Sequence, residues 1–158
     1  MSSDPTTDIV DLVVFTVNDV MCAFGVDEVQ EIKRVVHITP VHRAPEYVRG
    51  VINLRGQIVT VIDLRKKLNY HPVEINDLSR IVVVCRGGEQ IGLLVDTIED
   101  AVAAEKQEIL IPPSNIHGAE KRFFRGVYKT PDSLVAILDK EALLEKEKSI
   151  QGTPGSIT

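Results

Sequence analysis

The four histidines and two cysteines are the side chains best suited to act as bases, nucleophiles or metal ligands. No two histidines stand four residues apart on a helix-like stretch, and no carboxylate or cysteine lies beside them at ligand spacing. The chain also lacks both common glycine-rich phosphate loops. Cys22 and Cys85 lie inside strand-like apolar runs, where a thiol is usually a small buried side chain. We therefore expect no metal, no cofactor and no catalysis. The histidines are His37, His42, His71 and His117.

Four aspartates recur at equivalent places in two similar halves of the chain. They are Asp27, Asp63, Asp96 and Asp139. A pair of carboxylates could serve as a general acid and base. Their recurrence at the ends of strands or helices instead favours capping and turn hydrogen bonds.

Composition restricts the class of protein. The 158 residues carry 18 Lys and Arg against 23 Asp and Glu, a net charge of -5, with a pI near 5.4. This acidic balance argues against a nucleic-acid partner, and seven Phe and Tyr without Trp are few for base stacking.

No apolar run reaches the roughly 18 residues of a membrane span. The polar start, MSSDPTTD, does not resemble a signal peptide. We expect a cytoplasmic protein with reduced cysteines and no direct membrane insertion.

Strand signals dominate the elements that must position these residues. Residues 12–17 and 20–24 form β-branched runs separated by Asn18-Asp19, which predicts a hairpin. Residues 26–35 place Val26, Val29 and Ile32 three apart, which predicts a short helix. Pro45 is expected to open a helical turn over 46–49, and residues 58–62 read as a buried strand. Residues 70–79 are polar and aperiodic, which is typical of a connector.

The sequence repeats after this connector. A shift of 69 places Leu12-Val13-Val14-Phe15 on Ile81-Val82-Val83-Val84 and the turn Asn18-Asp19 on Gly87-Gly88. A shift of 76 places Arg49-Gly50-Val51 on Arg125-Gly126-Val127, and the change of shift marks a seven-residue insertion near Pro112-Pro113. We infer two related β units that share a buried face, because each is too small for a sizeable core of its own.

One polar element occurs in a single copy. Asn53 and Arg55 interrupt an apolar stretch just before Gly56, where the chain is expected to reverse. Spacing alone favours a turn with a solvated arginine. The second unit has Lys129-Thr130-Pro131-Asp132 at the equivalent positions, so the Asn-Leu-Arg-Gly chemistry is not needed to build the unit. It is a candidate for function.

Four blocks in order, VDEVQEI, RGVINLRGQIVTVIDLR, IGLLVDTIEDAV and FFRGVYKTPDSLVAILD, resemble the CheW-like domain family of bacterial chemotaxis coupling proteins. The resemblance implies a mainly β fold: two SH3-like five-stranded β-barrel lobes packed around a shared hydrophobic core, with short helices. It places one CheW-like domain at 9–148 between disordered ends at 1–8 and 149–158. Within it we expect lobe 1 at about 10–70, a connector at 71–79, lobe 2 at about 80–144 and a C-terminal helix at about 140–148.

The resemblance also implies a non-catalytic scaffold. Its partners would be the signalling tip of a methyl-accepting chemoreceptor and the regulatory domain of the histidine kinase CheA, in membrane-bound receptor arrays. The positions that match the family's receptor groove between the lobes are Val29, Glu31, Ile32 and Ile98. Those that match its N-L-R-G element, whose arginine is linked to coupling, are Val51, Asn53, Leu54 and Arg55. Two alternatives stay open: an adaptor of a surface-motility or developmental pathway, and a double barrel that binds a small molecule between its lobes.

Overall fold

The computed structural model describes residues 8–145, which form two large β-sheets, a short two-stranded sheet, two one-turn α-helices and three 3₁₀ turns. The six-stranded lobe has the order β12-β13-β2-β1-β8, with β9 also paired to β1. Its strands are β1 (Ile9–Val17), β2 (Val20–Gly25), β8 (Thr97–Ile98), β9 (Val102–Glu105), β12 (Phe124–Lys129) and β13 (Leu134–Leu138). The five-stranded lobe has the order β3-β6-β7-β5-β4. Its strands are β3 (Val29–Arg34), β4 (Val48–Leu54), β5 (Gln57–Asp63), β6 (Arg80–Arg86) and β7 (Glu89–Val95).

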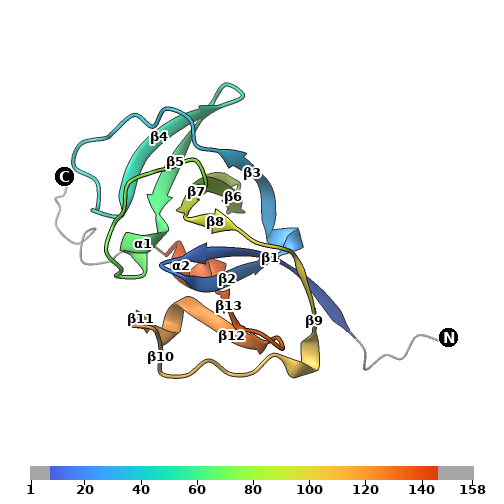
Figure 1. Cartoon of the computed structure of the whole chain (residues 1–158). Coiled ribbons are helices and arrows are strands. Elements are labelled where there is room, and N and C mark those ends of the chain that lie inside the picture. The colour runs from blue at the N-terminus through green and yellow to red at the C-terminus, as the bar shows by residue number, and fades with distance from the viewer. Residues whose placement is uncertain (1–7, 146–158) are drawn as a thin grey trace.

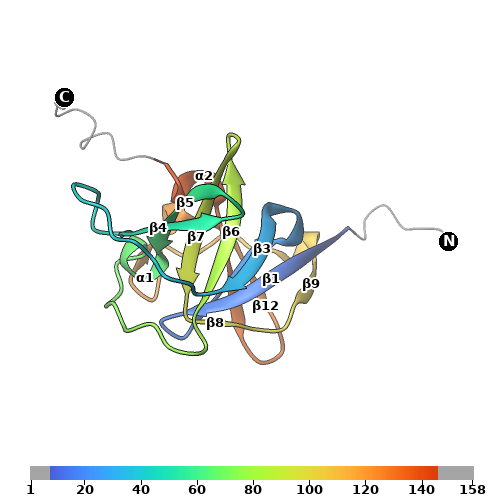
Figure 2. The ribbon, with the colours of Figure 1, turned by 90° about the horizontal axis from the view of Figure 1, so that it is seen from above.

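The remaining elements lie around these sheets. They are η1 (Val26–Glu28), α1 (Leu64–Lys67), η2 (Lys106–Glu108), β10 (Asn115–Ile116), β11 (Ala119–Glu120), η3 (Lys121–Phe123) and α2 (Lys140–Leu143). Figure 1 shows the five-stranded lobe above the six-stranded lobe, and Figure 2 shows the strand order of the five-stranded lobe from β4 across to β3. The mainly β fold with two SH3-like lobes is therefore confirmed. β8 and β9 pair with successive parts of β1 and together occupy the position of one strand. In the five-stranded lobe the equivalent position, next to β6, is occupied by β3 alone.

The two lobes do not follow the two sequence repeats. The expected lobes at about 10–70 and 80–144 are replaced by an exchange: the five-stranded lobe uses residues 29–95, and the six-stranded lobe uses 9–25 with 97–138. Each repeat lends its first hairpin to the sheet of the other. The connector at 71–79 consequently lies within the five-stranded lobe. Similarity between repeats reveals equivalent strands, but it carries no information on which strands pair.

Two parallel strand pairs join the repeats and have matching registers. β13 pairs with β2 through Ala136↔Cys22 and Ile137↔Ala23, and β5 pairs with β7 through Thr60↔Ile91 and Val61↔Gly92. The shifts of 69 and 76 transform one set of partners into the other. The duplication inferred from the sequence is thus confirmed at the level of backbone pairing.

Strand alternation divides the apolar side chains among three clusters. In β6, Ile81 and Val83 contribute to the five-stranded lobe's own core, whereas Val82 and Val84 contribute to a core shared by both lobes. β1 alternates in the same way between the shared core and the six-stranded lobe's own core. The shared core is the largest cluster and includes residues from both sheets, which confirms the expected common face. Because each fully buried aliphatic or Phe side chain contributes about 1.5–3 kcal/mol, this cluster holds the lobes together.

The aspartates at strand ends cap the two α-helices, as expected. Asp63 Oδ1 accepts a hydrogen bond from Lys66 N at 3.4 Å, and Asp139 Oδ1 accepts one from Ala142 N at 3.1 Å. Helix α2 ends at Leu143, earlier than the predicted end near 148; residues 146–148 and the expected disordered ends at 1–7 and 149–158 lie outside the described residues.

Two predicted helices are wrong. Residues 29–34 form β3, and only Val26–Glu28 makes a 3₁₀ turn. The cause is a β-bulge between Val29 and Glu31, which puts Val29 and Ile32 opposite Val84 and Val82, on one face. A bulged strand therefore reproduces the three-residue spacing of a helix. The predicted helical turn at 46–49 is a β-turn closed by Val48 N and Pro45 O at 2.9 Å, and β4 starts at Val48.

The repeated Arg-Gly-Val element has a glycine at its centre because another segment of the chain crosses over that residue in each lobe. Thr39 forms two backbone hydrogen bonds with Val51, and Leu110 forms two with Val127. These crossing segments pass directly over Gly50 and Gly126. A Cβ on Gly126 would lie 2.5 Å from Ile109 Cγ2 and 3.1 Å from Leu110 O. The absence of a side chain is what lets the segments approach.

Replacing Gly126 by Ala should lower the free energy of unfolding by about 1–3 kcal/mol, because the added methyl group overfills a packed crossing. Urea unfolding followed by circular dichroism measures this loss. Gly25→Ala is the matched control, since the nearest atom to a Cβ there is Asp27 Oδ1 at 2.9 Å, at the end of a side chain that can turn away. The next atoms, from Glu28 and Arg125, lie at ordinary contact distances. Equal losses in both variants would contradict the crossing argument.

Burial raises the pKa of the Cys22 thiol to about 12, with a smaller contribution from Asp96. The unfolded thiol, with a pKa near 9.0, releases its proton at lower pH than the folded one. Stability should therefore fall as pH rises above about 9. Cys22→Ala should make this fall shallower in urea titrations at successive pH values, whereas Cys85→Ala serves as the control. Burial also raises the pKa of Tyr70 to about 12, so part of the slope should persist.

Candidate functional site

The first candidate surface lies at the seam between the lobes, where β3 and β8 form the edges of their sheets (Figure 1). Val29 pairs with Val84, and Ile98 pairs with Phe15. Both side chains are half-buried and pack against the shared core from opposite lobes. Ile32 is on the same face of β3 as Val29 and is 38% exposed. We call Val29, Ile32 and Ile98 the seam surface; its exposed aliphatic groups suit the apolar face of a partner helix.

The second candidate surface is the outer face of the β4–β5 hairpin. Val51 pairs with Thr60 and Asn53 with Ile58, so these four side chains share one face. Ile58 is 69% exposed, and a shallow hollow of about 350 Å³ lies beside it, lined by residues that include Val36 and Val51. We call Val51, Asn53, Ile58 and Thr60 the hairpin face.

Leu54, also predicted to contact a partner, points to the opposite side of this hairpin. It is 3% exposed and packs in the five-stranded lobe's own core with Ile52 and Val59. Packing in this core therefore explains why the Asn-Leu-Arg-Gly element has a leucine at position 54. Ile58, in contrast, was expected inside a buried strand. Its alternation with Val59 and its position next to the Arg55-Gly56 turn are the sequence signals that place it outside.

In the six-stranded lobe, part of the equivalent face is buried. The equivalents of Val51 and Thr60 are Val127 and Ala136, which are buried in the shared core with Ile116 and Ala119. Ile116 and Ala119 belong to β10 and β11, beyond the insertion that only the second repeat carries. The fold therefore packs apolar side chains over this face where the chain supplies them. In the five-stranded lobe Val51 and Thr60 are half-buried instead. The equivalent of Ile58 is Leu134, which is 41% exposed, so this end of the face is exposed in both lobes.

Arg55 occupies the tip of the β4–β5 hairpin. It has a φ of 52° and Gly56 one of 84°, a turn that matches the twist of the hairpin, and Asn53 Oδ1 accepts a hydrogen bond from Gly56 N at 2.9 Å. The Arg55 guanidinium forms an ion pair with the Glu31 carboxylate on β3. Since β3 and β4 are opposite edges of one sheet, the pair links those edges. Its hydrogen bond lowers the pKa of Glu31 and raises the pKa of Arg55.

The equivalents of this ion pair in the other lobe are Asp100 and Pro131, which cannot form one. Two of the predicted site residues, Arg55 and Glu31, are thus brought together, on the side of β3 that faces away from Ile32. The Arg55 side chain is 68% exposed, so a partner can reach its guanidinium without breaking the lobe.

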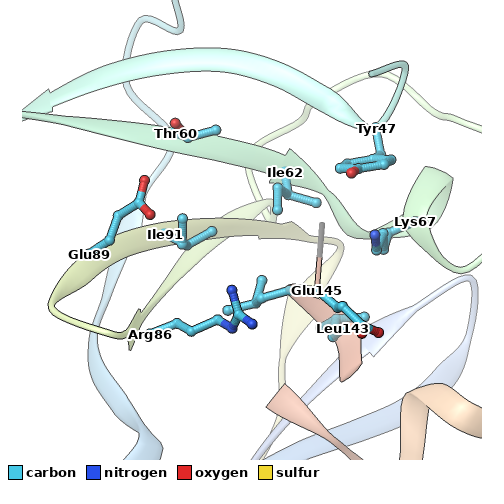
Figure 3. A pocket seen from close by; sticks show the side chains of 10 residues that line it. Tyr47, Thr60, Ile62, Lys67, Arg86, Glu89, Ile91, Leu143 and Glu145 are labelled. Atoms are coloured by element: carbon cyan, nitrogen blue, oxygen red, sulfur yellow. The ribbon is translucent and has the colours of Figure 1, made fainter. Parts of the chain in front are cut away.

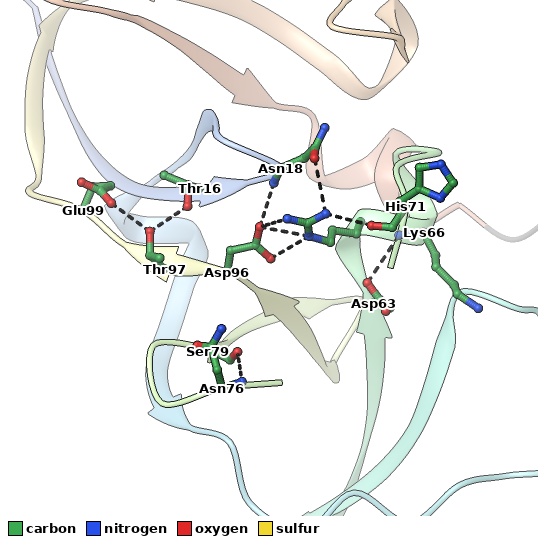
Figure 4. Close-up of polar contacts among 11 residues, drawn as sticks. Thr16, Asn18, Asp63, Lys66, His71, Asn76, Ser79, Asp96, Thr97 and Glu99 are labelled. Carbon is green, nitrogen blue, oxygen red and sulfur yellow. Dashed lines mark hydrogen bonds and ion pairs between the residues drawn. The ribbon is translucent and has the colours of Figure 1, made fainter. Parts of the chain in front are cut away.

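A polar network that no sequence motif indicated surrounds Arg65, and Figure 4 labels its partners Asp96, Asn18 and His71. The guanidinium donates to Asp96 through Nε at 3.0 Å and Nη2 at 2.7 Å. Its Nη1 donates to Asn18 Oδ1 at 3.3 Å and to the His71 carbonyl at 2.8 Å. The Asp96 hydrogen bond raises the pKa of Arg65. Asp96 was expected to make turn hydrogen bonds, and it also accepts one from Asn18 N at 2.8 Å.

A cavity of about 280 Å³ lies between β5, β7 and α2. Figure 3 shows Tyr47 and Lys67 at one end and Arg86 and Glu89 at the other, with Ile91 between them. The Lys67 ammonium lies 4.0 Å from the centroid of the Tyr47 ring, a cation–π contact. The volume is just below the range typical of small-molecule sites. This cavity is where the small-molecule alternative would place a ligand.

Nothing in residues 8–145 groups three His, Cys, Asp or Glu side chains around a possible metal ion. Of the helices within that range, none is long and apolar enough to cross a membrane.

Comparisons with known proteins agree with this arrangement. The model of the CheW-like domain matches residues 11–148. The chain is 34% identical to the chemotaxis protein CheW of Bacillus subtilis, over 90% of this chain and 92% of that protein. It is 29% identical to the protein FrzA of Myxococcus xanthus, over 63% and 62% of the two chains. The crystal structure of the scaffolding protein TtCheW from Thermoanaerobacter tengcongensis superposes with a TM-score of 0.82 at 28% identity, covering 93% of this chain and 95% of that one.

Replacing Arg55 by Ala should raise the pKa of Glu31 toward its ordinary value, because the hydrogen bond to the guanidinium is the largest cause of its depression. A depressed carboxyl pKa means that the pair contributes above the ordinary pKa near 4.5 and is lost as pH falls below it. Carboxyl NMR titration of Glu31 measures the change, with a nearly unchanged Tm at pH 7. Arg125→Ala is the control, since Arg125 pairs with Glu28. An unchanged Glu31 titration in Arg55→Ala would refute the assignment.

Proposed function

Since this chain belongs to the CheW-like domain family, we propose that it is a non-catalytic chemotaxis scaffold that couples chemoreceptor signalling tips to the histidine kinase CheA. The observation that carries the proposal is the presence of two separate surfaces with exposed aliphatic side chains. The seam surface is built on β3 and β8, and the hairpin face is built on β4 and β5, which lie in the same sheet as β3. A protein that bridges two partners needs such an arrangement. The proposed location is the cytoplasm, at membrane-bound receptor arrays.

The seam surface is the proposed receptor-binding site. A receptor tip is a helical hairpin, and amphipathic helices dock by placing aliphatic anchors into an apolar groove. Val29 and Ile98 supply the half-buried floor, and Ile32 supplies an exposed anchor. A few such central contacts dominate the affinity of an interface.

The hairpin face is the proposed contact for the CheA regulatory domain, which the family resemblance describes as a CheW-like fold. The support is the high exposure of Ile58 and the burial, in the twin lobe, of the equivalents of Val51 and Thr60. Those equivalents, Val127 and Ala136, are in one buried cluster with Ile116 and Ala119 of this same fold. Arg55 lies beside the hairpin face and can add charge-assisted hydrogen bonds to a partner carboxylate. One arginine already paired to Glu31 can accept a second carboxylate through its remaining N–H groups.

The alternative is an adaptor of a surface-motility or developmental pathway. The observation behind it is the relation to FrzA of Myxococcus xanthus, a CheW-like relative under a different name. Both readings use the same two surfaces and differ in the receptor and kinase that are bound. A binding comparison with partners from the same genome separates them. Calorimetry with purines and other metabolites tests the small-molecule reading, which a sub-micromolar ligand would favour.

The test uses the full chain with a purified receptor signalling tip and a purified CheA regulatory domain. Ile32→Asp should weaken receptor binding roughly tenfold or more and leave regulatory-domain binding nearly unchanged, whereas Ile58→Asp should do the reverse. Surface plasmon resonance measures both affinities.

Leu78→Asp is the matched control, because Leu78 is 62% exposed and lies in the connector, outside the residues that define the two surfaces. Circular dichroism confirms that each variant is folded. Should Ile32→Asp unfold, Val26→Asp provides the second variant in η1, just before β3, since Val26 is 54% exposed. Wild-type protein that binds neither partner would refute the scaffold function, and variants that bind like wild type would refute the surfaces.

A further inference from the structure

The chain crosses between the lobes twice, and Asp96 stands at the second crossing. The first passage, from β2 to β3, runs through η1. The second connects Val95, the last residue of β7, to Thr97, the first residue of β8, with Asp96 alone between them. The position of Asp96 therefore determines where the edge strand of the six-stranded lobe begins.

The Arg65 side chain connects this crossing to both lobes. Its guanidinium binds both Asp96 oxygens through Nε at 3.0 Å, and Nη2 adds a third contact at 2.7 Å. Nη1 reaches Asn18 in the β1–β2 turn of the six-stranded lobe. Arg65 itself is on α1, at the end of β5 in the five-stranded lobe. We call Arg65, Asp96 and Asn18 the clamp. The side chains of Arg65 and Asp96 are only 15% and 22% exposed, so solvent screens this ion pair weakly.

The first crossing has no equivalent of this clamp. The two shifts place Arg65 on Glu141, Asp96 on Asp27 and Asn18 on Gly87. Two carboxylates and a glycine cannot form a guanidinium clamp, and η1 carries instead the longer contact of Glu28 with Arg125, at 3.7 Å. The fold thus builds a crossing between lobes without a clamp. This comparison indicates that the clamp has a role beyond connecting the two lobes.

The strand that follows Asp96 carries the seam surface. Asp96 N donates to Thr16 O at 2.9 Å, the hydroxyls of Thr97 and Thr16 lie 2.7 Å apart, and Ile98 follows. We propose that Arg65 is a positioning residue for the seam surface: by fixing Asp96 against both lobes, it sets the place of Ile98 relative to β3. This inference rests on the proposed receptor-binding role of the seam. The bidentate fork of arginine is the essential chemistry, because a lysine could not hold both carboxylate oxygens and Asn18 together.

The test is Arg65→Lys in the full chain, with three measurements. Affinity for the receptor signalling tip should fall roughly tenfold, while affinity for the CheA regulatory domain stays within about twofold. Hydrogen exchange at the amides of Asp96 and Glu99, which donate to β1, should become faster than in wild type. Arg122→Lys, which alters the exposed pair with Glu120, is the control and should change none of the three.

A purely structural role would lower the Tm and both affinities together, and that outcome would overturn the proposal, as would unchanged exchange at Asp96 and Glu99. If Arg65→Lys does not fold, Asn18→Gly removes one arm of the clamp and keeps the positive φ of the turn. It should shift the same measurements in the same direction, and wild-type values would refute the proposal. If wild-type protein binds no receptor tip, the scaffold function fails, and the exchange measurement still decides whether Arg65 positions the strand.

Discussion

Two parallel strand pairs, β2 with β13 and β5 with β7, are the constraint on which the rest of the structure depends. Each joins a strand of one repeat to a strand of the other, so neither lobe can form from one repeat alone. The same strands direct alternate side chains into a lobe's own core and into the shared core. The repeats are therefore coupled by backbone hydrogen bonds within each sheet, and the lobes are coupled by apolar packing in the shared core.

Local chemistry that depends on a few neighbouring residues could be predicted from the sequence. The Asn18-Asp19 turn, the helix caps Asp63 and Asp139 and the repeat itself all follow from residue type and order. The strand exchange could not be predicted, because equivalent strands in a repeat can pair within a unit or between units. β3 was mistaken for a helix because the bulge at Val29 gives a strand the spacing of a helix.

The candidate site, too, could be predicted only in part from the sequence. Val29, Ile32 and Ile98 lie at the seam, and Arg55 and Glu31 meet as an ion pair. Leu54 is core, and Ile58, which no motif marks, is the most exposed apolar group of the hairpin face. Comparison of the lobes adds to this, because Val127 and Ala136 are buried whereas their equivalents Val51 and Thr60 are only half-buried. A single sequence cannot supply that comparison, because burial depends on segments distant along the chain.

The exchange of hairpins has a consequence for how such a chain can arise and be divided. A single repeat could build either lobe only by associating with another copy, each lending its first hairpin, so the protein is equivalent to an intertwined homodimer fused head to tail. A cut in the segment 71–79 would not separate the lobes. It would leave two fragments that each hold part of both sheets, and neither could complete a core until it had recombined with the other.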